Sequence, residues 1–334
     1  AKMTTKILKA LAAGTIAALG SVAVAEAADT VTFQLDWLPG GDKAPIYICI
    51  EKGFCAEEGI EAKVEPGRGS SEAITKLATG VSDVGSADIG ALMAAKVTED
   101  VPITAVMSIF NKGPHAFFVL KDSGIEDIPG IKGKEVATSP FTSSNVFLPL
   151  VLKDVGMTDD DIKLTKADPG ALGPMLMTGA TDVVIAWMTN VAVFTNQAKE
   201  AGKEITALPW DAAGLELYSA SLLASDKFLT ERPDVAKRFV KAFTKSLEFV
   251  KNNPTEAAEG MVAQIPELSV PDIEGSIKDT MTLEFNDVTE KDGLGAFEPG
   301  RLAATWDRVS AAQGLDKDAL DPETIVDRSY LSGM

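Results

Sequence analysis

The chain has 334 residues, of which 46% are apolar and 24% charged, a composition typical of a globular protein with about two domains. Its 31 lysines and arginines are outnumbered by 49 aspartates and glutamates, so the formal net charge is −18. A surface this acidic repels phosphate backbones and anionic lipids, which argues against a nucleic-acid partner.

The first 27 residues are typical of a secretory signal peptide. Three lysines, Lys2, Lys6 and Lys9, precede an apolar stretch at 10–25, and the small-residue sequence Ala25-Glu26-Ala27 follows. The alternative is a membrane anchor, but the stretch is shorter than the ~20 apolar residues that a span requires. We therefore expect a cleaved leader and a periplasmic protein. Losing three lysines and one glutamate changes its net charge from −18 to −20.

Strands and helices alternate in the next part of the chain. Val31 to Leu35 and Ile60 to Val64 have the pattern of strands, and each precedes a helical stretch, Ala44 to Lys52 and about Ser71 to Thr79. Alternation of this kind favours a parallel sheet covered by helices.

An internal repeat extends this pattern. Residues 77–85 (Leu-Ala-Thr-Gly-Val-Ser-Asp-Val-Gly) resemble residues 176–184 (Leu-Met-Thr-Gly-Ala-Thr-Asp-Val-Val) at an offset of 99. In each copy a glycine, Gly80 or Gly179, is placed to end a helix in the left-handed conformation, and an aspartate then opens an apolar strand. The repeat predicts two related α/β lobes.

The chain then returns to the first lobe. A strand is expected at Tyr218 to Ala224, followed by an amphipathic helix from Pro233 to Asn252. We expect residues 28–118 plus 223–334 to form lobe 1 and residues 119–222 to form lobe 2. Hinge crossings are predicted near Phe118 to Lys121 and Leu222 to Ala224.

Two cysteines, Cys49 and Cys55, flank Gly53. They could form a local disulfide in an oxidising compartment, or remain two small buried thiols, and we favour the thiols. With His115 as the single histidine and no second pair of thiols, a metal site is not expected.

Ligands of open α/β sheets bind beyond the carboxyl ends of the strands, where helix N-termini offer free N–H groups. The loops there are expected to face each other across an interlobe cleft. Trp37 follows a strand directly, and the repeat offset aligns Asp88 with Trp187 at matching strand ends. The predicted ligand-binding residues are Trp37, Lys43, Gly69, Ser70, Ser71, Asp88, Asn111, Thr142, Ser143, Ser144, Trp187 and Asn190.

Each of these residues has a simpler alternative role. The tryptophans could be structural, Ser70 and Ser71 could cap a helix, and Asp88 could be a solvated surface acid. Catalytic motifs are lacking: the sequence contains no G-x-S-x-G elbow, P-loop or dinucleotide fingerprint, and His115 is interpreted as a hinge or packing residue. We predict no catalytic residues, no metal and no cofactor.

The stretch Leu-Asp-Trp-Leu-Pro-Gly-Gly-Asp-Lys-Ala-Pro-Ile-Tyr at 35–47 closely resembles the opening motif of a family of periplasmic substrate-binding proteins. Their importers carry nitrate, sulfonate, taurine or thiamine-pyrimidine precursors. The resemblance continues at 51–60, 77–85, 120–125, 176–187 and 329–331, and so spans about 300 residues. It implies a type II periplasmic binding protein: two α/β lobes, two hinge strands, a ligand cleft between the lobes, and a monomer that delivers its solute to an ABC transporter permease in the inner membrane.

The resemblance leaves the solute open. The pyrimidine-precursor branch has Asn-Pro after Trp-x-Pro and a histidine just before Ala44, whereas this chain has Gly40, Gly41 and Lys43. A thiamine-pyrimidine precursor or similar heteroaromatic is the preferred ligand. A sulfonate, nitrate or aromatic carboxylate, attracted by Lys43 and Arg68, is the alternative.

A remote alternative is an enzyme. Related fungal pyrimidine synthases use a lysine that holds pyridoxal phosphate and a histidine that is consumed. The positions in this sequence that match them are Ala87 and Ala91, which supply neither group.

Overall fold

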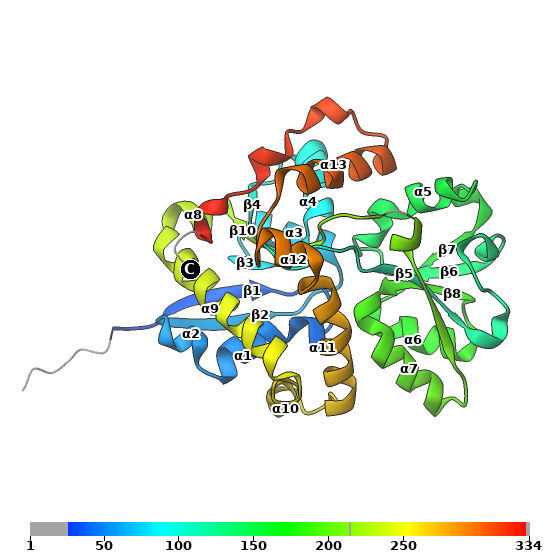
Figure 1. The fold of residues 1–334 in the computed structure, drawn as a ribbon, viewed down its shortest axis with the longest axis horizontal. Coiled ribbons are helices and arrows are strands. Elements are labelled where there is room, and N and C mark those ends of the chain that lie inside the picture. Colours follow the sequence, from blue (N-terminus) through cyan, green and yellow to red (C-terminus); the bar gives the residue numbers. More distant parts are fainter. Residues whose placement is uncertain (1–25, 214, 332–334) are drawn as a thin grey trace, which may run out of the picture.

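The structure is a computed structural model that describes residues 26–213 and 215–331. The predicted signal peptide at 1–27 lies almost entirely outside these residues. Figure 1 shows two α/β halves side by side, each built around a five-stranded mixed sheet. The predicted fold class, two α/β lobes, is confirmed.

The two sheets have the same design. The first has the strand order β2-β1-β3-β10-β4 and contains β1 (Asp29–Gln34), β2 (Ile60–Glu65), β3 (Val84–Asp88), β4 (Ile103–Ser108) and β10 (Ala220–Ser225). The second has the order β7-β6-β8-β5-β9 and contains β5 (His115–Leu120), β6 (Glu135–Thr138), β7 (Lys163–Lys166), β8 (Val183–Trp187) and β9 (Ile205–Pro209). In each sheet the first three strands are parallel, and the fourth is antiparallel to both of its neighbours.

Helices cover both sheets. Those that follow strands of the first sheet are α1 (Ala44–Glu51), α2 (Phe54–Glu57), α3 (Ser70–Ala78), α4 (Ile89–Glu99), α8 (Asp226–Glu231), α9 (Pro233–Asn252), α10 (Pro254–Gln264), α11 (Val270–Glu284), α12 (Asp287–Asp292) and α13 (Pro299–Gln313). Those of the second half are α5 (Ser144–Asp154), α6 (Pro169–Thr178) and α7 (Val191–Glu200). The predicted amphipathic helix at 233–252 is α9, and its buried apolar residues include Val235, Phe239, Ala242, Phe243 and Val250.

The repeat seen in the sequence is a structural repeat. Gly80 and Gly179 both end a helix in the left-handed conformation, each with φ of 77°. The aspartates that follow also match: an oxygen of Asp83 accepts from the N–H of Thr32 at 2.9 Å, and one of Asp182 accepts from the N–H of Glu135 at 3.0 Å. The predicted pair of strand ends is therefore confirmed, with Asp88 and Trp187 the last residues of β3 and β8.

The crossings between the sheets differ from the prediction. The chain passes to the second sheet through 109–114 and returns through 210–219, because β5 and β10 already pair with their own sheets. The predicted crossings near Phe118 to Lys121 and Leu222 to Ala224 fall in and just after β5 and within β10. Leu215 and Leu217 in the return segment are buried in an apolar cluster that continues from one half into the other.

The two cysteines are joined by a disulfide, so the favoured interpretation as free thiols is wrong. Gly53, with φ of 79°, reverses the chain between α1 and α2 and brings the two Cα atoms to 5.1 Å. That separation is within the range in which a disulfide forms without distortion.

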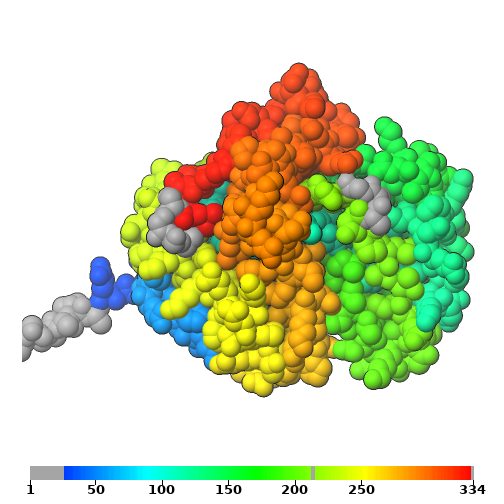
Figure 2. Space-filling model, viewed as in Figure 1, coloured from blue at the N-terminus to red at the C-terminus, as the bar shows by residue number. Residues whose placement is uncertain are grey.

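Among the helices in the described ranges, none is both long and apolar enough to cross a bilayer. Figure 2 shows the two halves side by side, with the helix α11 next to the second half.

Candidate functional site

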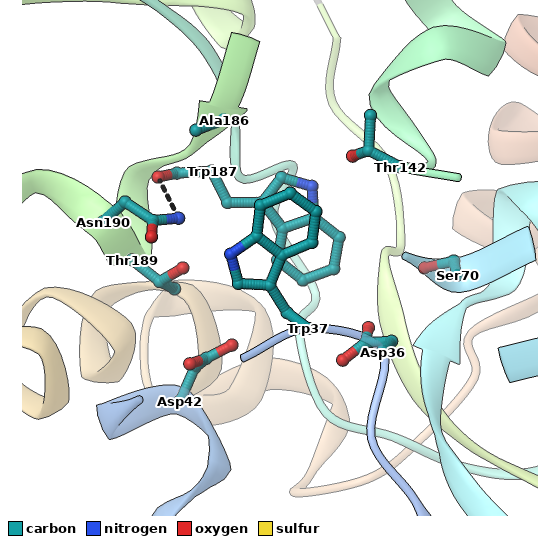
Figure 3. A pocket seen from close by; sticks show the side chains of 9 residues that line it. All are labelled: Asp36, Trp37, Asp42, Ser70, Thr142, Ala186, Trp187, Thr189 and Asn190. Atoms are coloured by element: carbon teal, nitrogen blue, oxygen red, sulfur yellow. Dashed lines mark hydrogen bonds between the residues drawn. The ribbon is translucent and has the colours of Figure 1, made fainter. Parts of the chain in front are cut away.

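A small cavity lies between the two halves, beyond the carboxyl ends of β1 and β8 (Figure 3). Its lining residues are Asp36, Trp37, Asp42, Ser70, Thr142, Ala186, Trp187, Thr189 and Asn190. Its volume of about 10 Å³ has room for about one water molecule. A larger solute can enter only if the halves or the side chains move apart.

The first half gives the cavity its charge. Asp36 follows β1, and the short 3₁₀ helix Gly41–Lys43 places Lys43 so that its ammonium donates to Asp36 Oδ1 and lies 2.8 Å from Asp42 Oδ2. All three side chains are buried. Two carboxylates around one ammonium leave a formal charge of −1, so the group favours a cationic or hydrogen-donating ligand.

Burial and pairing act against each other in this group. Burial raises the pKa of Asp36 above its ordinary value, and the Lys43 ammonium opposes that shift. Burial alone would lower the pKa of Lys43, but the carboxylates of Asp36 and Asp42 outweigh it and raise that pKa above its usual value. Lys43 is therefore a charged partner of two acids and not a free cation.

The second half supplies an aromatic, uncharged wall. Trp187 is 8% exposed and packs against Phe110 and His115, with ring centroids 5.7 and 6.0 Å away. Asn190 donates from its amide to the Trp187 carbonyl at 3.3 Å. Trp37, from the first half, is partly buried and packs against the apolar cluster of the second half. Figure 3 draws both indoles in the middle of the lining set.

Two buried polar atoms of the lining have no partner among the described residues: Asp36 Oδ2, an acceptor, and Trp187 Nε1, a donor. A buried polar group without a hydrogen bond costs about 1–3 kcal/mol. A ligand that presents one donor and one acceptor could supply the missing hydrogen bond to each atom.

The loop at 67–71 closes one side of the cavity. Ser70 lines the cavity, and its hydroxyl accepts from the N–H of Asp88 at 3.0 Å. Gly69 and Ser71 instead touch the opposite half: the N–H of Ser71 donates to Phe141 O at 3.1 Å, and a Cβ on Gly69 would lie 2.2 Å from the Phe141 backbone. These two residues join the halves without lining the cavity.

The predicted loop at 142–144 divides in the same way. Thr142 lines the cavity, while Ser143 and Ser144 are buried behind it. Ser144 Oγ lies 2.8 Å from His115 Nδ1, and His115 Nε2 lies 3.4 Å from Asp88 Oδ2.

Local sequence patterns do not indicate this Ser–His–Asp row, because its members come from three distant segments. All three side chains are buried and none lines the cavity. Asp88 is also held by the Ser219 hydroxyl and by the N–H of Gly90, which it caps. It is therefore not a solvated surface acid, and the row is a contact between the halves.

Asn111 is placed away from the cavity. Its amide donates to Thr289 Oγ1 at 2.8 Å and its side-chain oxygen accepts from Asn286 at 2.6 Å. Nearby Glu284 is 1% exposed, and burial, followed by the charge of Asp42, raises the pKa of its carboxyl well above the ordinary value, against the effect of Lys43.

The structure thus brings five predicted residues to one cavity: Trp37, Ser70, Thr142, Trp187 and Asn190. It adds Asp36, Asp42, Ala186 and Thr189, which the sequence analysis did not single out. Asp36 is the neighbour of Trp37 at the end of the first strand, so its position was a usable signal. No group of three or more potential metal ligands occurs among the described residues.

Comparison with known proteins places this chain in a family. The family described as NMT1/THI5 like matches residues 41–257. The riboflavin-binding protein RibY of Chloroflexus aurantiacus is 23% identical over 311 residues, 91% of this chain and 86% of that protein. The formylaminopyrimidine-binding protein of Halalkalibacterium halodurans is 22% identical, over 85% of this chain and 84% of that protein.

Fungal relatives are named as 4-amino-5-hydroxymethyl-2-methylpyrimidine phosphate synthases. Among solved structures, the alkanesulfonate-binding protein SsuA from Xanthomonas axonopodis pv. citri, bound to MOPS, has a TM-score of 0.71. It is 14% identical and matches over 90% of this chain and 98% of that one. The likeness shows a shared fold, that of a periplasmic binding protein.

Proposed function

The chain belongs to the NMT1/THI5-like family, and on that premise we propose that it is a non-catalytic receptor for a small, planar, amino-bearing heteroaromatic solute. The solute binds in the cavity between the halves. An aminopyrimidine of the thiamine-precursor type is the preferred ligand. The similarity to a riboflavin-binding protein and to a formylaminopyrimidine-binding protein supports this class of ligand.

The observation that carries the proposal is the pairing of two indoles with two unpartnered polar atoms at one cavity. An aminopyrimidine has a flat face that can stack on Trp37, an amino group that can donate to Asp36 Oδ2, and ring nitrogens that can accept from the Nε1–H at the edge of Trp187. Stacking against aromatic rings contributes about 0.5–1.5 kcal/mol beyond the buried area.

An anionic solute fits this cavity less well. Lys43 is already shared by two carboxylates, and Arg68 is half-exposed, is paired with Glu72 at 2.6 Å and does not line the cavity. A sulfonate, nitrate or carboxylate would face Asp36 and Asp42 with no free cation among the lining residues. We therefore place the anion receptor second.

The hypothesis that the protein is a pyrimidine synthase has less support. The positions that the resemblance assigns to the lysine and histidine of the fungal synthases hold Ala87 and Ala91, both buried apolar residues. Neither can form a Schiff base or be consumed as a source of ring atoms.

We further propose that the protein is exported through its N-terminal segment and acts in the periplasm as a monomer with an ABC importer. The two halves that the crossings at 109–114 and 210–219 join are proposed to close on the ligand, because contacts from both halves exist only when they are together. Small-angle scattering tests this step: a smaller radius of gyration at saturating ligand is expected, and an unchanged radius contradicts closure.

Native mass spectrometry of the purified protein, followed by a thermal-shift panel, tests the ligand class. We expect a retained or added aminopyrimidine and a rise in Tm that salt leaves nearly unchanged, since a neutral ring does not depend on surface charge. Stabilisation by sulfonates or carboxylates alone, falling with added salt, would overturn the choice of ligand and leave a receptor for anions.

A further inference from the structure

A second, larger hollow lies beside the cavity. This groove lies between α6 and α7 of one half and the β1–α1 loop, α11 and the α10–α11 loop of the other. It shares Trp37, Asp42, Thr189 and Asn190 with the cavity, so these four residues lie between the two spaces. When the halves or these side chains move apart to admit a ligand, part of that ligand can extend into the groove.

The groove is large enough for a second chemical group. Its volume is about 410 Å³, within the range of about 300–1,000 Å³ for small-molecule sites. Much of its wall is apolar, including Val193, Phe194 and Leu268. Leu38 also lines it and is 43% exposed, and few large apolar side chains in the described part of the chain are as exposed.

The charges in the groove have one sign. Asp42, Glu267 and Asp272 line it, and its described lining contains no lysine, arginine or histidine. Asp42 is paired with Lys43 and Asp272 accepts from Asn196, whereas Glu267 is exposed at the rim. Gln197 adds a shielded side-chain oxygen without a partner among the described residues. Such a wall attracts a cation and repels a phosphate.

We propose that the groove is the second half of the ligand site and takes a positively charged group joined to the heteroaromatic ring. This inference rests on the proposed receptor function, and it narrows the ligand to two-part molecules that carry no phosphate. The ring contacts Trp187 and Asp36 in the cavity, the linker passes Thr189 and Asn190, and the cation lies against Asp42 and Glu267.

The test compares ligands that share the ring. Thiamine joins an aminopyrimidine to a cationic second ring, 4-amino-5-hydroxymethyl-2-methylpyrimidine is the ring alone, and the phosphate ester of the latter adds negative charge. In the wild-type protein, calorimetry is expected to show thiamine binding at least tenfold more tightly than the ring alone. The phosphate ester is expected to bind more weakly than either.

A matched pair of variants tests whether the tighter binding of thiamine depends on the groove. Gly170→Phe fills the groove from the first turn of α6, where an added Cβ would meet only Leu38 Cδ1, at 4.0 Å. Thr178→Phe adds the same ring at the exposed far end of that helix, away from the groove. Gly170→Phe is expected to abolish the advantage of thiamine while binding the ring alone normally, which also shows that it is folded. Thr178→Phe is expected to keep the advantage.

The outcomes separate the two proposals. Equal affinities for thiamine and the ring alone, or an advantage that survives Gly170→Phe, would overturn the groove proposal and leave the receptor standing. A phosphate ester that binds as tightly as thiamine would also overturn it. Failure of the wild-type protein to bind any of the three compounds would overturn both proposals.

Discussion

The two halves of the molecule share one scaffold but contribute different chemistry to the cavity. Each has the same order of strands, and in each a glycine at φ of 77° and an aspartate lead into the strand that ends at the cleft. The first half places a buried pair of carboxylates there, and the second an indole, an amide and small side chains. The repeat therefore sets where the site lies, while the residues at the strand ends set what it binds.

The largest expected effect comes from removing the single ammonium of the charged half. Lys43→Met leaves Asp36 and Asp42 buried without a counter-ion, which typically costs 3–5 kcal/mol. Urea unfolding is the measurement, with Lys52→Met as the control, because the Lys52–Glu256 pair is partly exposed and is expected to contribute much less to stability.

A rescue makes this prediction sharper. Adding Asp36→Asn to Lys43→Met removes one of the two stranded charges and is expected to recover part of the lost stability. If Lys43→Met unfolds at the same urea concentration as Lys52→Met, then Lys43 does not stabilise the buried carboxylates of Asp36 and Asp42 as described.

The disulfide belongs to the first half alone, since the chain has no other cysteines. Replacing Cys49 and Cys55 by alanine opens a short loop and is expected to cost about 2 kcal/mol. Hydrogen exchange followed by mass spectrometry is expected to show faster exchange in β1 and β2 and little change in β6 and β8. Equal acceleration in both halves would show that they unfold as one unit.

Glu284 gives the first half a pH dependence. Because burial raises its folded-state pKa, the stability that this group contributes is complete below about pH 4, its unfolded pKa being ~4.3, and is lost as the pH rises through the folded-state value. Glu284→Gln is therefore expected to have a higher Tm than wild type at pH 8 and a similar Tm at pH 4. The exposed Glu61→Gln variant controls for the lost charge. A Tm gap that does not change with pH would contradict this account.

The smallest effect tests the repeat itself. Asp83→Ala and Asp182→Ala each remove a carboxylate that accepts one backbone N–H at the start of an equivalent strand. Each is expected to cost about 1 kcal/mol, with Asp83 slightly higher because it also faces Arg232 at 3.2 Å. A difference of several kcal/mol between them in urea unfolding would show that the two copies are not equivalent.

The scaffold was readable from the sequence because it depends on local signals. Glycines that end helices, apolar runs that form buried strands and the spacing of the two copies were enough to place Trp37 and Trp187 at one cleft. The crossings were misplaced because β5 and β10 pair with strands far away in the sequence, and the pattern of a single strand does not reveal its partners.

The polar part of the site was harder to predict for the same reason. The Asn111 amide donates a hydrogen bond to Thr289, a residue 178 positions away in the sequence. The hydroxyl of Ser219 donates one to Asp88, which is 131 positions away. Lys43 was treated as a free cation because its two acidic partners are visible only once the 3₁₀ helix folds back on the strand end. Such pairings decide the charge of the site, and the local pattern does not contain them.

The central claim is that both halves hold one aminopyrimidine ring between Trp37 and Trp187. Isothermal titration calorimetry with 4-amino-5-hydroxymethyl-2-methylpyrimidine tests it most directly, on wild type, Trp37→Ala and Trp187→Ala. One site per chain is expected, with Kd raised at least tenfold, or about 1.4 kcal/mol, in each variant. Unchanged Kd values in both folded variants, or no heat of binding in the wild-type protein, would contradict the claim.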